Sequence, residues 1–132
     1  MKIAAIDIGL KRIGVAYSPD GNVVFPQDAI MRKNRDQASR DVDAFLDEYG
    51  IDRLVVGIPR GGESEGEMER RIRHFVGLLS FKGTVDYEDE YGSSFEAKEL
   101  SKGVFKQRRD GKIDSLAAQI ILERWIRRNQ TK

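Results

Sequence analysis

Acidic residues occupy three stretches of the chain where their positions need a chemical explanation. Asp7 interrupts the apolar run IAAIDI at residues 3–8, which is typical of a central strand covered on both faces. Asp89 and Glu90 are adjacent anions at the end of another expected strand, and Asp114 shares a helical stripe with apolar residues. A buried carboxylate without a cation or a hydrogen-bond partner is strongly disfavoured, so Asp7 in particular requires compensation.

Carboxylates brought together from these stretches suit a hard divalent cation. Mg²⁺ and Mn²⁺ bind a few carboxylate oxygens and keep the rest of their coordination shell for water and substrate phosphate. Two such ions about 3.5–4 Å apart can activate water and stabilise the leaving oxygen in phosphodiester hydrolysis. The chain has no cysteine and one histidine, which excludes thiolate and multi-histidine zinc sites. Metal-dependent hydrolysis of a nucleic acid is the chemistry that these residues favour.

Each acid also has a structural interpretation. Asp7 would then be a buried acid paired with Lys11 or Arg12, because a buried charge needs a partner whatever its function. The acidic pair at residues 89–90 would be a solvated strand end. Asp114 would be the N-terminal cap of a helix, where aspartate is favoured.

The apolar spacing indicates the elements that must position these acids. Five strands are expected, at residues 3–8, 13–18, 23–25, 51–58 and 84–88. Three amphipathic helices are expected, at residues 38–49, 68–79 and 113–126, with a short helix opened by a capping box at 93–96. The aromatic residues of the helical stripes are expected in the core, and His74 on a helix surface; these aromatic residues are Phe45, Tyr49, Phe75 and Trp125.

This order of elements predicts an α/β fold in one domain over residues 1–132. The first three strands form an antiparallel meander joined by tight turns, and the later strand, helix, strand repeats imply right-handed parallel crossovers. Such crossovers are expected to place the first strand beside the strand that ends at the acidic pair. The N-terminal end of the last helix would then cross both strands, so that all three acidic stretches converge.

The charge distribution points to a nucleic-acid partner that the total charge hides. The net charge is +1, but residues 106–132 hold eight basic and three acidic residues, a balance of +5, which leaves −4 for the other 105 residues. Phosphate contacts require such a local basic surface. No run approaches the roughly 20 apolar residues of a membrane span, and no export signal opens the chain, so a cytoplasmic location is expected.

Candidate phosphate contacts lie next to two of the acids in the sequence. Lys11 and Arg12 follow Asp7 closely, and a mostly basic loop at 101–112 precedes Asp114. The loop contributes the candidates Lys106, Arg108, Arg109 and Lys112. Three arginines further along the chain could instead stabilise the C-terminal end of the last helix, where positive charge is favourable. They are Arg124, Arg127 and Arg128.

Several motifs resemble the YqgF family of Holliday junction resolvase-like nucleases over nearly the whole chain. They are DIGLKRIGVA at 7–16, VVGIP at 55–59, DE at 89–90, GKIDSLAA at 111–118 and IILE at 120–123. The resemblance implies an RNase H-like fold, with a five-stranded mixed sheet flanked by helices. It also implies that Asp7, Glu90 and Asp114 are the catalytic, metal-binding acids.

The resemblance further implies a function and its partners. Family members are implicated in maturation of the 5′ end of pre-16S ribosomal RNA, and similarity to junction resolvases suggests branched DNA as another substrate. Two Mg²⁺ or Mn²⁺ ions are expected with substrate bound, on pre-ribosomal RNA, ribosomal precursor particles or DNA, and no membrane partner is expected. A junction resolvase needs two active sites, so both a monomer and a homodimer are compatible with the sequence. The chain departs from the family at Tyr91 and Gly92, where an arginine and an apolar residue are usual.

Two other functions are compatible with parts of the sequence. Asp7 and Gly9 before a second strand resemble the phosphate-binding hairpin of the actin, Hsp70 and sugar-kinase group. Those proteins close two related domains around ATP, whereas 132 residues supply one. The other alternative is a non-catalytic RNA- or ribosome-binding domain, which the missing arginine at Tyr91 favours, because tyrosine cannot bind phosphate as a cation.

Overall fold

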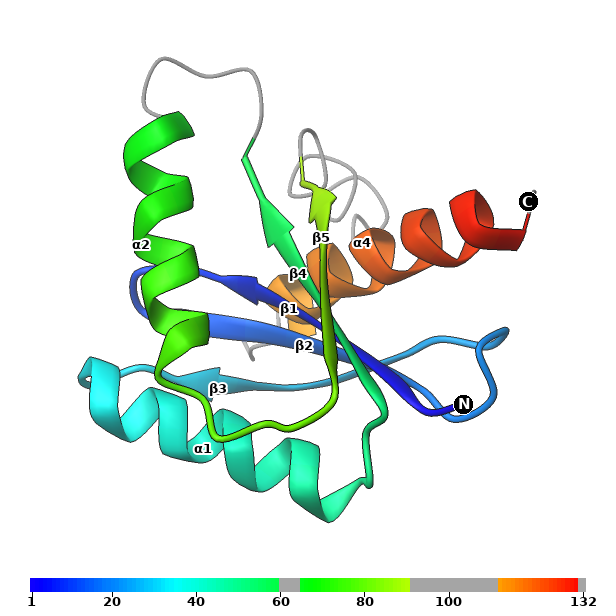
Figure 1. Cartoon of the computed structure of the whole chain (residues 1–132), viewed down its shortest axis with the longest axis horizontal. Coiled ribbons are helices and arrows are strands. Elements are labelled where there is room, and N and C mark those ends of the chain that lie inside the picture. The colour runs from blue at the N-terminus through cyan, green and yellow to red at the C-terminus, as the bar shows by residue number, and fades with distance from the viewer. Residues whose placement is uncertain (60–64, 91–111, 131–132) are drawn as a thin grey trace.

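A five-stranded sheet with helices on both faces forms the body of the molecule in a computed structural model (Figure 1). The structure describes residues 1–59, 65–90 and 112–130, with residues 65, 112–114 and 130 described by their backbone alone. The strands are β1 (Ile3–Ile8), β2 (Arg12–Ser18), β3 (Phe25–Met31), β4 (Arg53–Ile58) and β5 (Thr84–Asp89). The helices are α1 (Arg35–Glu48), α2 (Glu65–Gly77) and α4 (Lys112–Gln130). No helix in these ranges is long and apolar enough to cross a membrane.

The sheet has the strand order β3-β2-β1-β4-β5. β1 pairs with β2, and β2 with β3, in antiparallel orientation, whereas β1–β4 and β4–β5 are parallel. The mixed sheet is therefore as predicted. The expected contact between β1 and the strand that ends at the acidic pair is wrong, because that strand is β5 and β4 lies between them.

The strand β3 also differs from its prediction. It covers Phe25–Met31 rather than residues 23–25, and it includes Pro26. Proline cannot donate to a neighbouring strand, which makes it unfavourable inside a sheet, but β3 is an edge strand with one unpaired side. Helix α1 begins three residues before the predicted start, because Asn34 and Gln37 form a capping box.

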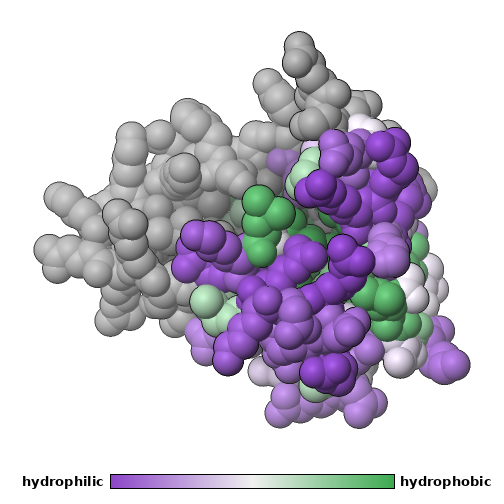
Figure 2. Space-filling view, turned by 90° about the vertical axis from the view of Figure 1, so that its left-hand side faces the viewer, coloured by the Kyte–Doolittle hydropathy of each residue, from purple (hydrophilic) through white to green (hydrophobic). Residues whose placement is uncertain are grey.

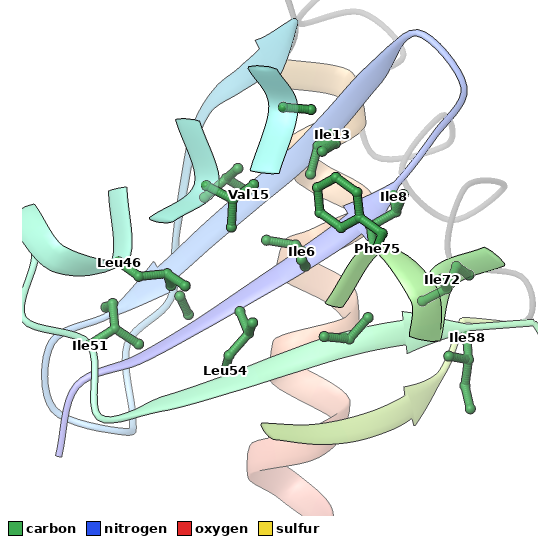
Figure 3. Packing of buried hydrophobic residues seen from close by; sticks show 14 residues of the cluster. Ile6, Ile8, Ile13, Val15, Leu46, Ile51, Leu54, Ile58, Ile72 and Phe75 are labelled. Carbon is green, nitrogen blue, oxygen red and sulfur yellow. The ribbon is translucent and has the colours of Figure 1, made fainter. Parts of the chain in front are cut away.

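Alternating residues of β1 face two different cores. Ile6 and Ile8 pack with α1 and α2, in the cluster that Figure 3 shows around Phe75. Ile3 and Ala5 pack with α4 on the other face of the sheet. Because successive side chains of a strand point to opposite faces, this pattern places Asp7 on the face covered by α4.

Helix α4 packs across this second face through the predicted stripe. Ala118, Ile121, Leu122 and Trp125 are all buried. Near its N-terminal end, the hydroxyl oxygen of the fully buried Ser115 accepts a hydrogen bond of 3.1 Å from the backbone N–H of Val15 on β2. This bond fixes the start of α4 to the strand beside β1. His74 is exposed and Phe75 buried, as expected, while Phe45 and Tyr49 pack at the edge of the first core.

Candidate active site

Asp7 and Glu90 meet at the edge of the sheet where the parallel strands end. Asp7 lies on β1, paired with Gly14 of β2. Glu90 follows β5, and its backbone N–H donates a hydrogen bond of 2.9 Å to the carbonyl of Ile58 at the end of β4. The Glu90 carboxyl group is hydrogen-bonded to Asp7. Two of the three acids identified from the sequence are therefore in contact.

The contact is possible because β4 carries no side chain between the two acids. The β1–β4 ladder pairs Ile6 with Val56, so Gly57 is the next residue of β4 alongside Asp7. A Cβ atom at Gly57 would lie 2.6 Å from Cδ1 of Ile121 and 3.0 Å from Oε2 of Glu90. A side chain at this position would force Ile121 and Glu90 to shift, whereas glycine leaves room for Glu90 to reach across the strand.

The electrostatics of the pair favour a positive charge between the carboxylates. Burial raises the pKa of Glu90 to about 8, with further contributions from its hydrogen bond to Asp7 and the negative charges of Asp7 and Asp89. A carboxyl group that resists ionisation beside another carboxylate becomes an ionised ligand when a divalent cation is bound. The donor set is entirely oxygen, which fits Mg²⁺ or Mn²⁺.

The backbone of Asp114 lies in the first turn of α4, next to Ser115. The Ser115 hydroxyl accepts a hydrogen bond from the backbone of Val15 on β2. Val15 follows Gly14, the residue of β2 that pairs with Asp7. The helix start is thus attached to the strand beside Asp7, while the Asp114 carboxylate lies outside the described residues. Among the side chains that the structure describes, no group of three potential metal ligands is formed, and Asp7 and Glu90 are the two predicted acids that it brings together.

The candidate phosphate contacts divide into two groups. Lys11 and Arg12 are exposed in the turn from β1 to β2, and the N–H of Gly9 donates to the carbonyl of Arg12 across this turn at 2.9 Å. A Cβ atom at Gly9 would lie 2.6 Å from that carbonyl oxygen, so the tight turn requires glycine. The backbone of Lys112 begins α4, and the remaining predictions lie outside the described residues: Lys106, Arg108, Arg109, Tyr91, Gly92, the short helix at 93–96 and most of the loop at 101–112.

A model of the RuvX family, described as Holliday junction resolvase, matches residues 1–128. The chain belongs to this family. The expected membership of the YqgF group of resolvase-like nucleases is thereby confirmed. A relative from Sulfurovum sp. (strain NBC37-1), named as a candidate pre-16S rRNA nuclease, is 63% identical over 126 residues, which are 96% of this chain and 98% of the relative. A relative of the same name from Sulfurimonas denitrificans is 54% identical over 127 residues, again 96% and 98% of the two chains.

Solved structures confirm the RNase H-like fold of this RuvX-family chain. RuvC of T. thermophilus in complex with a Holliday junction substrate has a TM-score of 0.59 at 14% identity and covers 98% of this chain and 96% of RuvC. The fowlpox virus resolvase with its junction DNA also has a TM-score of 0.59, at 16% identity, covering 98% and 99%. At these identities the likeness concerns the fold.

Sequence reasoning missed two residues that shape the site of this RuvX-family chain. Gly57 was recognised as part of a motif, but its role depends on α4 and Glu90, which are distant in sequence. Arg32 holds the turn after β1: its Nη1 donates to the carbonyl of Gly9, and its backbone N–H to the carbonyl of Lys11, both at 2.9 Å. The signal for Arg32 was the basic run MRKNR at residues 31–35.

Replacing Gly57 with Ala is expected to destabilise the protein by about 1–3 kcal/mol, because the added methyl group overpacks against Ile121 and Glu90. Urea unfolding measures the effect. The matched control is Gly77→Ala at the end of α2, where nothing lies within 4 Å of the new methyl group and the stability should hold or rise. Equal stabilities of the two variants would contradict the role given to Gly57.

Proposed function

We propose that this chain is a Mg²⁺- or Mn²⁺-dependent nuclease that hydrolyses phosphodiester bonds during 5′-end processing of pre-16S ribosomal RNA. The proposal rests mainly on the hydrogen bond between the carboxyl groups of Asp7 and Glu90. This contact is possible because Gly57, which lies between them on β4, has no side chain. Family membership and the names of its relatives support the activity and the substrate. The same membership favours a nuclease over an ATP-binding protein of the actin and Hsp70 group.

Asp7 and Glu90, with Asp114 from the first turn of α4, would hold the metal ions. When bound, the ions supply activation of the attacking water and stabilisation of the leaving oxygen. The chain itself provides the geometry: the backbone bond from Glu90 to Ile58 fixes one acid at the strand end, and the sheet fixes the other. Lys11 and Arg12 extend from the adjacent turn and would bind the phosphates that flank the scissile bond.

Branched DNA is the second candidate substrate, and the description of the family model favours it. Cleavage of a four-way junction requires two active sites, so this function predicts a homodimer, whereas trimming of RNA is compatible with a monomer. For the RNA function we place the chain in the cytoplasm, acting on ribosomal precursor particles.

The test compares pre-16S ribosomal RNA and a four-way DNA junction as substrates for the purified full chain, in Mg²⁺, in Mn²⁺ and in EDTA. The proposal expects metal-dependent shortening of the RNA at its 5′ end and no cleavage in EDTA. Cleavage of the junction alone, by a protein with the mass of a dimer, would favour the second candidate. Binding of RNA without cleavage of either substrate would instead support a non-catalytic RNA- or ribosome-binding domain.

A further inference from the structure

An open groove of about 770 Å³ lies beside the turn that follows β1. One wall is α2, and the opposite wall is the segment that joins β3 to α1, with Ile8 and Leu10 between them. Figure 2 views this side of the molecule and shows hydrophilic side chains above and below a small hydrophobic patch. The volume is within the range of pockets that hold a drug-sized ligand and would accommodate about two nucleotides.

The groove has a strongly positive lining. Among the residues that the structure describes, its lining has four arginines and one acid, Glu67, so the charge of these groups is +3. Glu67 is paired with one of the arginines, Arg71, at 2.8 Å. Arg32, Arg35 and Arg70 make no ion pair within the part of the chain that the structure describes. Cations gathered on a concave surface attract a polyanion.

Two of these arginines are held in place before any ligand arrives. Arg32 donates to the carbonyl of Gly9 and lies over the ring of Phe75, with 5.6 Å between Cζ and the ring centroid. Nη1 of Arg35 lies 3.2 Å from Nε2 of His74. Because the guanidinium group can only donate, Arg35 is the donor in this contact. Ordered cations lose less conformational entropy on binding than free ones do.

The groove and the proposed catalytic edge lie on opposite sides of the turn that follows β1. Ile8 faces the groove side of the sheet, whereas Asp7 faces α4, so the turn at residues 9–12 separates the two. Lys11 and Arg12, both exposed, lie in or just after this turn. These two residues place positive charge at the turn between the groove and Asp7.

We propose that this groove binds a single-stranded segment of RNA directly adjacent to the scissile phosphate, with its phosphates on Arg32, Arg35 and Arg70. The inference rests on the proposed nuclease function and names a substrate-binding surface for it. Leu10, 75% exposed at the mouth of the groove, offers an apolar surface to the face of a base. Bases of a single strand expose these faces, whereas a duplex buries them in its stack.

The test measures binding of a fluorescently labelled 12-nucleotide RNA by anisotropy, in EDTA so that no cleavage occurs. The variant is Arg35→Ala with Arg70→Ala. Loss of two phosphate contacts is expected to weaken binding about tenfold and to reduce the slope of log K against log salt by about 1.4. A duplex of the same sequence is expected to bind the parent protein at least about fivefold more weakly than the single strand.

The matched control replaces two exposed basic residues outside the groove, Arg40→Ala with Lys82→Ala, and removes the same charge. It should leave the affinity within about twofold of the parent and the salt slope unchanged. Equal losses in the two double variants, unchanged binding in the groove variant, or equal binding of single strand and duplex would each overturn the inference. So would a parent protein that does not bind the RNA.

The result of the groove-binding test can be distinguished from the result of the cleavage test of the proposed function. If the protein cleaves pre-16S ribosomal RNA but the groove variant binds like the parent, the groove inference fails and the function stands. If no RNA is cleaved in any metal but the groove variant alone loses affinity, the nuclease proposal fails and the groove remains a site for single-stranded RNA. Thermal unfolding of the exposed-site variants is expected to match that of the parent.

Discussion

Replacement of Asp7 with Asn is expected to lower metal-dependent cleavage at least about 1,000-fold while the protein stays folded. Asparagine keeps the size of the side chain and can still hydrogen-bond Glu90, but it removes the charge that would hold a divalent ion. A bound ion contributes several kcal/mol to stabilisation of the transition state, and about 4 kcal/mol corresponds to this factor. Single-turnover cleavage of pre-16S ribosomal RNA in Mg²⁺ measures it.

The matched control for this prediction is Asp89→Asn. Asp89 is the last residue of β5 and adjoins Glu90, so the change removes a neighbouring carboxylate from the same edge of the sheet. The side chain of Glu90 is hydrogen-bonded to Asp7, whereas Asp89 is not among the proposed metal ligands, so the control should retain activity within about tenfold of the parent. Cleavage by Asp7→Asn above a tenth of the parent rate, with unchanged thermal unfolding, would show that the mechanism with three acids is wrong.

The sequence was sufficient for those parts of the fold that depend on local pattern. The apolar run that surrounds Asp7 identified β1, and the alternation of that strand determines which face the carboxylate occupies. The stripe from Ala118 to Trp125 identified the buried face of α4. The capping box at Asn34 and Gln37 was equally local, and the predicted start of α1 was late because the apolar stripe begins after it.

Features that depend on contacts between distant elements could not be predicted from one sequence. The hydrophobic periodicity of the sequence does not show that β4 lies between β1 and β5 in the sheet. It also does not show that residue 57 must be glycine for the Glu90 side chain to reach Asp7. The C-terminal arginines show the same limit. Arg124 donates to the carbonyl of Asp89 at 3.3 Å, and Arg128 pairs with Glu88, so both connect α4 to β5 in addition to lying near the helix end.

The family resemblance was needed to decide which acid of the pair Asp89 and Glu90 belongs to the site. Charge and position alone do not distinguish Asp89 from Glu90, because both lie at the end of the same strand. The family pattern selects Glu90, and the structure brings that residue into contact with Asp7. The arginines of the groove were missed for a different reason: Arg32 and Arg35 are separated from Arg70 by more than 30 residues, so no local charge count gathers them.

Replacement of Glu90 with Gln is expected to stabilise the metal-free protein at pH 8. The folded state raises the pKa of Glu90 from 4.5 to about 8, so this state binds the proton more tightly than the unfolded chain does. The contribution of Glu90 to stability therefore falls as pH rises from about 4.5 to about 8. Glutamine is neutral at every pH and avoids this loss. Because solvent screens the half-buried charge, we expect a gain of about 1–2 kcal/mol.

Urea unfolding in EDTA at pH 4.5 and pH 8 measures the effect as a difference between variant and parent. The difference should be near zero at the lower pH and favour Glu90→Gln at the higher one. The control Glu48→Gln, at an exposed position at the end of α1, should change stability by less than about 0.5 kcal/mol at both. A difference that does not grow with pH would contradict the unfavourable ionisation of Glu90.

Adding Mg²⁺ is expected to make the parent protein more stable than Glu90→Gln, the reverse of their order in EDTA. An ion that binds only the folded parent stabilises it by about 2.7 kcal/mol at 100 times its dissociation constant, and Glu90→Gln lacks one ligand for that ion. The same carboxylate that weakens the metal-free fold would therefore strengthen the metal-bound one. If Mg²⁺ raises the stability of both proteins equally, Glu90 does not bind the metal, whatever the pH dependence in EDTA.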